Sequence, residues 1–107
     1  MLLLMLGPGM PWAQLRELRV LAIANNRLTD VSPLAALTKL ERVDLAKNLL
    51  PDVQSLKALL DGAPRLEEID LRDNPISSSR QMLDAVIVHG TSLQTLKYHR
   101  PRYPATN

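Results

Sequence analysis

The sequence contains no cysteine and no phenylalanine, and only 3% of its 107 residues are aromatic. The absence of cysteine excludes disulfide bonds, zinc sites built on thiolates, iron–sulfur ligation and thiol catalysis. It is also typical of a reducing compartment. The only histidines are His89 and His99. Two histidines without cysteine are too few for a metal site, and we expect both to face solvent. We therefore expect no metal and no cofactor.

Long apolar runs are lacking as well. The opening run, Met1–Leu6, has no basic residue before it and ends at Gly7. It is shorter than the apolar region of a signal peptide, about 7 to 15 residues, and far shorter than a membrane span of about 20. We expect an intracellular chain, cytoplasmic or cytoskeletal, that makes no contact with a membrane.

The chain has the length of one domain with a modest core. It contains 22 leucines, and 46% of its residues are hydrophobic, so its apolar side chains are unusually uniform in shape. This uniformity favours a repeating scaffold. Residues 1–96 carry ten basic and eleven acidic side chains, so the net charge of +2 comes from the segment that begins at Lys97.

A five-position pattern of four apolar residues and one asparagine occurs three times. The copies are Leu18-x-x-Leu21-x-Ile23-x-x-Asn26-x-Leu28, Leu40-x-x-Val43-x-Leu45-x-x-Asn48-x-Leu50 and Leu66-x-x-Ile69-x-Leu71-x-x-Asn74-x-Ile76. A fourth copy, Leu93-x-x-Leu96-x-Tyr98, has Pro101 where the asparagine is due. The spacings of 22, 26 and 27 residues between the starts of the copies indicate a solenoid.

Each copy predicts a short strand followed by a bend at the asparagine, whose amide can satisfy backbone groups there. Apolar residues at every third position in residues 31–40 predict a 3₁₀ turn. A helix is predicted to begin at Pro51 or Asp52 and to end at Gly62 and Pro64. A second one is predicted between a cap at Ser77 or Ser78 and Gly90. The apolar faces of these helices are Val53, Leu56, Leu59 and Leu60, and Met82, Leu83, Val86 and Ile87.

These elements predict an α/β solenoid with a curved parallel sheet of about four strands on the concave face. The 3₁₀ turns and two helices lie on the convex face. We divide the chain into a degenerate first repeat or N-terminal lid (1–11), the repeat domain with its C-terminal cap (12–98) and a basic tail (99–107).

The repeat resembles the leucine-rich repeat family, in particular the 22-residue subclass typified by a protein phosphatase 1 regulator. The end of the pattern, Asn74-Pro75-Ile76 and then Ser92-Leu93-x-x-Leu96, is similar to the C-terminal cap of that subclass. Similar caps occur in axonemal dynein light chain 1 and in the U2 small nuclear ribonucleoprotein A-prime protein. The resemblance implies a non-enzymatic protein-binding scaffold, a small subunit or adaptor in an axonemal or ciliary, phosphatase-regulatory or similar assembly. It adds the cilium, or alternatively the nucleus, as a location.

In such a repeat the side chains between the leucines form columns on the concave face. The predicted columns are Val20, Arg42, Glu68 and Thr95; Ala22, Asp44, Asp70 and Lys97; and Ala24, Ala46, Arg72 and His99. A partner segment can lie against the alanines and place a basic side chain over Asp44 and Asp70. Alternatively, the columns form a solvated face whose charges pair across strands.

Asp44 and Asp70 are the only hint of an enzyme, because their predicted separation of roughly 5 Å is one that catalytic carboxylates use. We expect Arg42 and Arg72 to keep both carboxylates ionised. We also expect a short arc to offer no pocket and no opposing base. The sequence therefore predicts no enzymatic activity and no small-molecule substrate.

Four strands offer roughly 300 Å² of concave surface, whereas a stable interface needs about 800 Å² per partner. The N-terminal residues Met1, Leu4, Leu6 and Trp12 lie where a polar cap is due, so they provide a possible second contact with another subunit. Alternatively they fold back as a lid on their own domain.

The basic tail mixes cations with aromatic rings, a composition that can contact phosphates and stack on bases. Its candidate contact residues are Arg100, Arg102 and Tyr103. RNA contact within a ribonucleoprotein particle is the alternative function that this tail indicates. Docking on an acidic protein surface and plain disorder explain the same composition.

Overall fold

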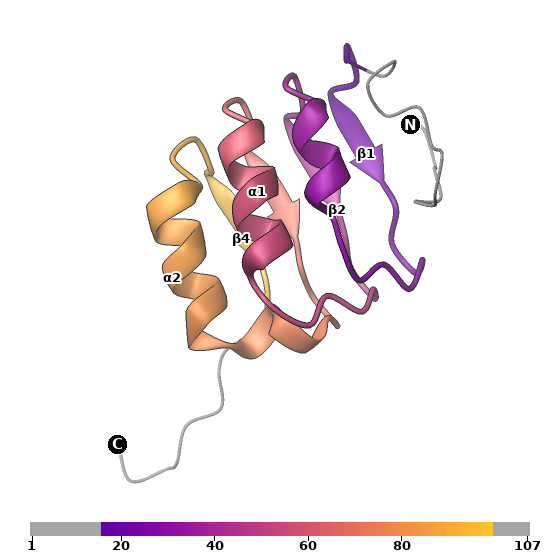
Figure 1. Cartoon of the computed structure of the whole chain (residues 1–107), viewed down its shortest axis with the longest axis vertical. Helices are drawn as coiled ribbons and strands as arrows, with labels where there is room; N and C mark the ends of the chain where they lie inside the picture. The colour runs from indigo at the N-terminus through magenta and orange to yellow at the C-terminus, as the bar shows by residue number, and fades with distance from the viewer. Residues whose placement is uncertain (1–15, 100–107) are drawn as a thin grey trace, which may run out of the picture.

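A computed structural model of the chain describes residues 16–99. Over this range the chain winds through four strands, two 3₁₀ turns and two α-helices (Figure 1). The elements are β1 (Val20–Ala22), η2 (Ser32–Ala36), β2 (Arg42–Asp44), α1 (Gln54–Gly62), β3 (Glu68–Asp70), η3 (Pro75–Ser78), α2 (Arg80–His89) and β4 (Thr95–Lys97). The sheet is parallel in the order β1-β2-β3-β4, so each turn of the chain adds the next strand.

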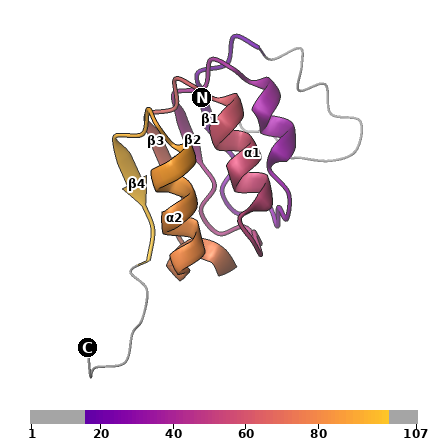
Figure 2. The same ribbon diagram turned by 60° about the vertical axis from the view of Figure 1, so that its left-hand side comes forward.

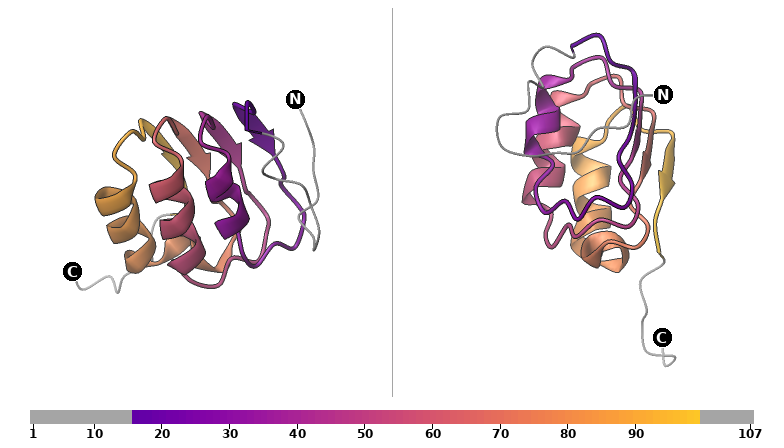
Figure 3. Two further views of the ribbon diagram at one scale, coloured as in Figure 1. Left: turned by 45° about the horizontal axis from the view of Figure 1, so that its top comes forward. Right: turned by 90° about the vertical axis from the view of Figure 1, so that its right-hand side faces the viewer.

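The molecule has two layers, a sheet on one side and the turns and helices on the other (Figures 2 and 3). Leu21, Val43 and Ile69 occupy matching positions in β1, β2 and β3, and each is at most 3% exposed. The outer segments cover them with the apolar faces of η2, α1 and α2. This architecture confirms the predicted solenoid and the 3₁₀ turn within residues 31–40.

The register of the strands confirms the first two predicted columns. Val20 pairs with Arg42, Arg42 with Glu68, and Glu68 with Thr95. Ala22, Asp44, Asp70 and Lys97 form the second column in the same way.

The asparagines bond the bends of neighbouring repeats together. The Asn48 Oδ1 accepts hydrogen bonds from the backbone N–H groups of Asn26 and Leu28, both at 3.0 Å. Its Nδ2 donates to the carbonyl oxygens of Ile23 at 3.1 Å and Leu45 at 2.9 Å. One turn later, the Asn74 Oδ1 accepts the Leu50 N–H at 3.2 Å, and its Nδ2 donates to the carbonyls of Leu45 and Leu71. Among the described residues every buried side-chain polar atom has a partner, so the predicted ladder is confirmed.

The bend before each asparagine uses a left-handed residue. Asn25, Lys47 and Asp73 have φ values of 64°, 58° and 61° and occupy the same position in successive repeats. A backbone of this kind is costly for side chains other than asparagine, aspartate and glycine. The bend therefore places Lys47 in an unfavourable backbone conformation.

The start of the first helix differs from the prediction. Helix α1 begins at Gln54, not at Pro51 or Asp52, and its cap residue Val53 makes no capping bond with its side chain. The Asp52 Oδ1 instead accepts the Gln54 N–H at 3.0 Å, which closes a turn before the helix. The helix ends at Gly62 as predicted.

The start of the second helix is also shifted, and one residue of its predicted apolar face is exposed. Pro75–Ser78 forms a separate 3₁₀ turn, so the cap is Ser79, whose Oγ accepts the Met82 N–H at 3.0 Å, and not Ser77 or Ser78. Ile87 is 76% exposed, so its predicted place in the core is wrong. The reason is helical geometry: Ile87 points about 140° away from the buried Met82, whereas Val86 points only about 40° away.

Several predictions fall on residues outside the described range. They concern the N-terminal set Met1, Leu4, Leu6 and Trp12 and the tail set Arg100, Arg102 and Tyr103. Within residues 16–99 no helix is both long enough and apolar enough to cross a membrane.

Candidate protein-binding surface

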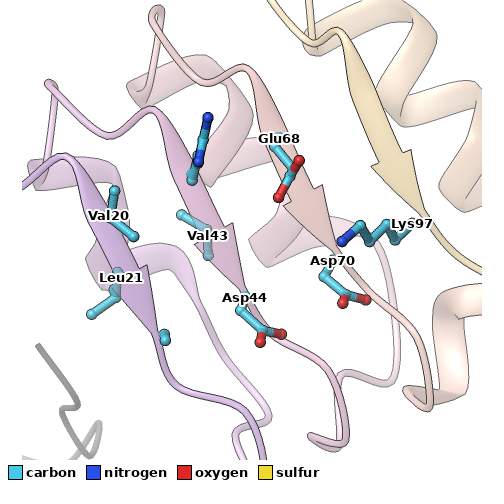
Figure 4. A pocket seen from close by; sticks show the side chains of 9 residues that line it. Val20, Leu21, Val43, Asp44, Glu68, Asp70 and Lys97 are labelled. Atoms are coloured by element: carbon cyan, nitrogen blue, oxygen red, sulfur yellow. The ribbon is translucent and has the colours of Figure 1, made fainter. Parts of the chain in front are cut away.

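The concave face carries a hollow of about 220 Å³ (Figure 4). It is lined by Val20, Leu21, Ala22, Arg42, Val43, Asp44, Glu68, Asp70 and Lys97. The expectation that a short arc offers no pocket is therefore wrong. The curvature of the parallel sheet brings residues of all four strands around one depression, which we call the concave hollow.

The hollow has an apolar end and a charged end. Val20, on β1, is 38% exposed, and Ala22 beside it is half-buried. Asp44 and Asp70 lie across the hollow from Val20, and the Lys97 side chain extends from β4 toward Asp70 (Figure 4). The surface can therefore receive an apolar group at β1 and a charged group at β2 and β3.

Asp70, the last residue of β3, is bound by Arg72, which follows the same strand. The Arg72 Nε donates to Oδ1 at 3.0 Å, Nη2 donates to Oδ2 at 2.8 Å, and the Arg72 backbone N–H donates to Oδ1 at 3.1 Å. Burial alone raises the pKa of Asp70, but the hydrogen bonds from Arg72 and the charges of Arg72 and Lys97 outweigh it, so the pKa lies below its ordinary value. Asp70 is thus a firmly ionised carboxylate and not a proton donor at neutral pH.

Asp44 occupies the same column and is close enough to the Arg72 charge to interact with it, but the two form no ion pair. Its Oδ1 accepts the backbone N–H of Ala46 at 3.0 Å, and within residues 16–99 no basic side chain forms an ion pair with it. Arg42, which we expected to help ionise both aspartates, forms no ion pair in the same part of the chain. The two aspartates therefore differ, and Asp44 offers the charge that an incoming group can neutralise.

The Asp70–Arg72 ion pair makes the free energy of unfolding depend on pH in the acidic range. Because the folded state lowers the pKa of Asp70, the stabilisation exists above the ordinary value of 3.8 and is lost as the pH falls through the folded value. We expect Arg72→Gln to lower the urea midpoint at neutral pH and to leave a smaller difference from the parent chain at strongly acidic pH. The effect is small, because the Arg72 side chain is 50% exposed.

Urea titrations across this acidic range check the pH dependence. Lys57→Gln removes a positive charge from helix α1 and serves as the control. A difference between Arg72→Gln and the parent that stays constant with pH would show that the loss has another cause.

The third predicted column continues the sheet beyond the strands. The Asn25 N–H donates to the Ala46 carbonyl at 3.0 Å, and the Lys47 N–H to the Arg72 carbonyl at 2.9 Å. His99 ends this column, with its Nε2 3.0 Å from the Asp73 Oδ1. The concave hollow itself excludes several predicted residues, which are Ala24, Ala46, Arg72, Thr95 and His99.

The histidines do more than face solvent. The His89 Nδ1 lies 2.7 Å from the Asp61 Oδ1, so it joins α2 to α1 and is half-buried, contrary to expectation. His99 is exposed but bonded to Asp73. The part of the chain that the structure describes holds no cluster of three or more side chains suited to a metal ion.

A second groove, of about 420 Å³, lies between the two helices on the convex side. Its lining residues are Val53, Lys57, Gln81, Asp84, Ala85, Val88 and His89. This groove could not be predicted, because the spacing of apolar residues in each helix does not reveal how far apart the two helices pack.

The winding, the asparagine ladder and the parallel sheet together define a leucine-rich repeat solenoid. A family profile described as "Leucine Rich repeats (2 copies)" matches residues 16–58. This match and the structural neighbours support the placement of the chain among leucine-rich repeat proteins. No curated protein sequence matches the chain significantly.

Solved structures share the fold. The chain is similar to Mex67 in the structure of the Chaetomium Mex67:Mtr2 subunits, with 24% identity and a TM-score of 0.67 over 90% of this chain and 64% of that one. It is similar to the Mex67 leucine-rich repeat domain of Chaetomium thermophilum, with 25% identity and a TM-score of 0.67 over 90% of this chain and 66% of that one. An internalin of Listeria monocytogenes gives 26% identity and a TM-score of 0.54 over 88% of this chain and 32% of its own. The chain thus spans less than two thirds of each of these proteins.

Proposed function

We propose that the chain is a non-enzymatic protein-recognition module that binds a partner through its concave hollow. Leucine-rich repeat domains are in general protein-interaction modules, and their stacked repeats create concave binding surfaces. The observation that carries the proposal is that the hollow holds an Asp44 carboxylate without an ion pair at one end and the exposed Val20 at the other.

The chemistry of the hollow defines the partner segment. A helix or an extended segment places an apolar side chain against Val20 and Ala22. In a helical partner, a lysine or arginine one or two turns from this apolar side chain reaches Asp44. In an extended partner, the basic residue lies one or two residues from it. Asp44 then gains a charge-assisted hydrogen bond that the free chain lacks. Asp70 already accepts hydrogen bonds from Arg72, so it contributes only to the electrostatic potential of the hollow.

The hollow is too small to hold a stable partner by itself, because the sheet offers roughly 300 Å² against the 800 Å² that a typical interface needs. We therefore propose that the chain is a small subunit or adaptor in a larger assembly, and that a second surface takes part. An intracellular setting, axonemal or phosphatase-regulatory, and membership of the 22-residue subclass are further parts of this proposal. The N-terminal contact stays a prediction outside the described residues.

The RNA-binding alternative rests on the basic tail, which also lies outside the described residues. No observation on residues 16–99 favours it over protein binding. Nuclease treatment of the native assembly separates the two functions, because an assembly held by RNA dissociates and one held by protein contacts does not.

Two substitutions in the hollow test the proposal in the full chain, expressed with a tag in its own cells. We expect Val20→Arg and Asp44→Lys each to weaken partner binding about tenfold, since one blocks the apolar end and the other repels the basic group. Asp84→Lys, the same charge reversal on the convex side, is the matched control and leaves binding unchanged. The proposal fails if the proteins recovered with the chain are the same, in the same amounts, for all three variants.

A further inference from the structure

The last repeat keeps the apolar residues of an inner repeat, although no described residue lies beyond it. Leu93 and Leu96 are only partly buried. Their counterparts one repeat earlier, Leu66 and Ile69, are 1% and 0% exposed. Leu93 and Leu96 therefore occupy core positions of the repeat but are only partly covered at this end of the described solenoid.

Helix α2 adds to this open end. Its residues Gln81, Asp84 and Val88 line the groove toward α1, so Leu83 and Ile87, one turn apart, lie on the opposite side of the helix. Ile87 is 76% exposed and Leu83 partly buried. We call the surface formed by Leu83, Ile87, Leu93 and Leu96 the C-terminal end surface. Within the described residues, this end of the solenoid therefore carries apolar side chains where a capped end presents polar ones.

Strand β4 borders this surface with free backbone groups. The Thr95 N–H donates to the Glu67 carbonyl, and the Lys97 carbonyl accepts from Leu71, so both residues direct their backbone toward β3. Alternation along the strand directs the N–H and C=O of Leu96 the other way. Within the described chain β4 has no neighbour on that side, so it offers a parallel edge like the one that β3 offers to β4.

We propose that the C-terminal end surface binds an extended segment of another protein, which adds to β4 as a fifth parallel strand. Its apolar side chain covers Leu96 and Ile87. Its acidic side chain lies opposite Lys97, as Asp70 does on the other side of β4. This is peptide recognition by strand addition, in which backbone hydrogen bonds give affinity and alternate side chains give specificity.

Charge favours a segment of another protein over a second copy of this chain and over the chain's own residues 100–107. A second copy that pairs β4 with β4 places two Lys97 side chains on one face of the joined sheet, where like charges repel. Residues 100–107 contain no acidic side chain and include Pro101 and Pro104, which interrupt strand pairing. Neither supplies the acid that Lys97 lacks on its open side.

The test uses a random peptide library displayed on phage and selected on the immobilised full chain. We expect enriched peptides in which an acidic residue alternates with apolar ones. Binding should weaken at least about tenfold in Ile87→Lys, because an exposed apolar contact becomes a charge. Val88→Lys is the matched control on the same helix and leaves binding unchanged. In the parent chain, the bound peptide should slow amide hydrogen exchange at Leu96.

Other outcomes overturn this proposal without touching the proposed function. These are the absence of enriched peptides, equal binding by Ile87→Lys, or loss of binding in Val20→Arg, which assigns the peptides to the concave hollow. Self-association of the free chain that Ile87→Lys abolishes assigns the surface to a second copy. Circular dichroism of each variant confirms that it is folded.

Discussion

Replacing Asn48 by alanine is expected to lower the free energy of unfolding by about 3 to 5 kcal/mol, a large share of the roughly 5 to 15 kcal/mol that holds a small domain together. The side chain is 2% exposed and bonds backbone groups of two successive bends. Alanine leaves the N–H groups of Asn26 and Leu28 without partners in a place that water reaches poorly. The Ile23 and Leu45 carbonyls keep the hydrogen bonds that the Asn26 and Asn74 side chains donate to them. Each such group costs about 1 to 3 kcal/mol.

Urea denaturation of the parent and the variant measures this loss. Asn26→Ala is the matched control, because Asn26 occupies the same position one repeat earlier and, within residues 16–99, its side chain bonds only the carbonyls of Ile23 and Ala24. We expect it to cost less than half as much. Equal losses for Asn26 and Asn48 would mean that the link between repeats is not what makes the asparagine important.

Replacing Gly62 by alanine is expected to destabilise the chain by about 2 kcal/mol, although alanine in a helix is ordinarily more favourable than glycine by about 1 kcal/mol. A Cβ at this position meets the carbonyl oxygen, Cβ and Cα of Ala35 at 2.6, 2.7 and 2.8 Å. These atoms belong mainly to the backbone of η2, which cannot move aside without separating η2 from α1. The clash therefore outweighs the gain in helix propensity.

The sign of the Gly62→Ala effect is the informative result in a thermal or urea melt. Ala35→Gly in the same background removes one of the three clashing atoms and should restore part of the stability. Ala58→Gly in the middle of α1 gives the ordinary propensity effect for comparison. A stabilised Gly62→Ala variant would show that the contact between η2 and α1 is looser than the structure has it.

The strand register could be predicted because two features of the repeat determine it independently. The leucine positions decide which side chains point inward, and the asparagine decides where each strand ends, so Arg42, Glu68 and Thr95 could be placed in one column before the structure. The caps could not be predicted in the same way. Ser77, Ser78 and Ser79 have equal capping ability, and the choice falls to Ser79 because the Ile76 N–H bonds the Leu50 carbonyl of the preceding repeat.

The columns of the candidate surface could be predicted, but not which of their residues line the concave hollow. Asp44 and Asp70 have the same place in the repeat, and what separates them is the residue two positions later, Ala46 in one case and Arg72 in the other. Side chains two apart on a strand share a face, so this difference was present in the sequence. The exposure of Ile87 was not, because the sequence does not reveal that the buried side of α2 is centred on Met82, Ala85 and Val86, from which Ile87 points away.

The proposed function requires that the concave hollow contact a partner protein. The most direct measurement places a photo-crosslinking amino acid at Ala22 in the full chain within its own cells, with the same group at Asp84 on the convex side as the control. We expect irradiation to join the chain to one protein from Ala22 and not from Asp84. Crosslinks to nucleic acid, or to protein from Asp84 alone, would contradict it.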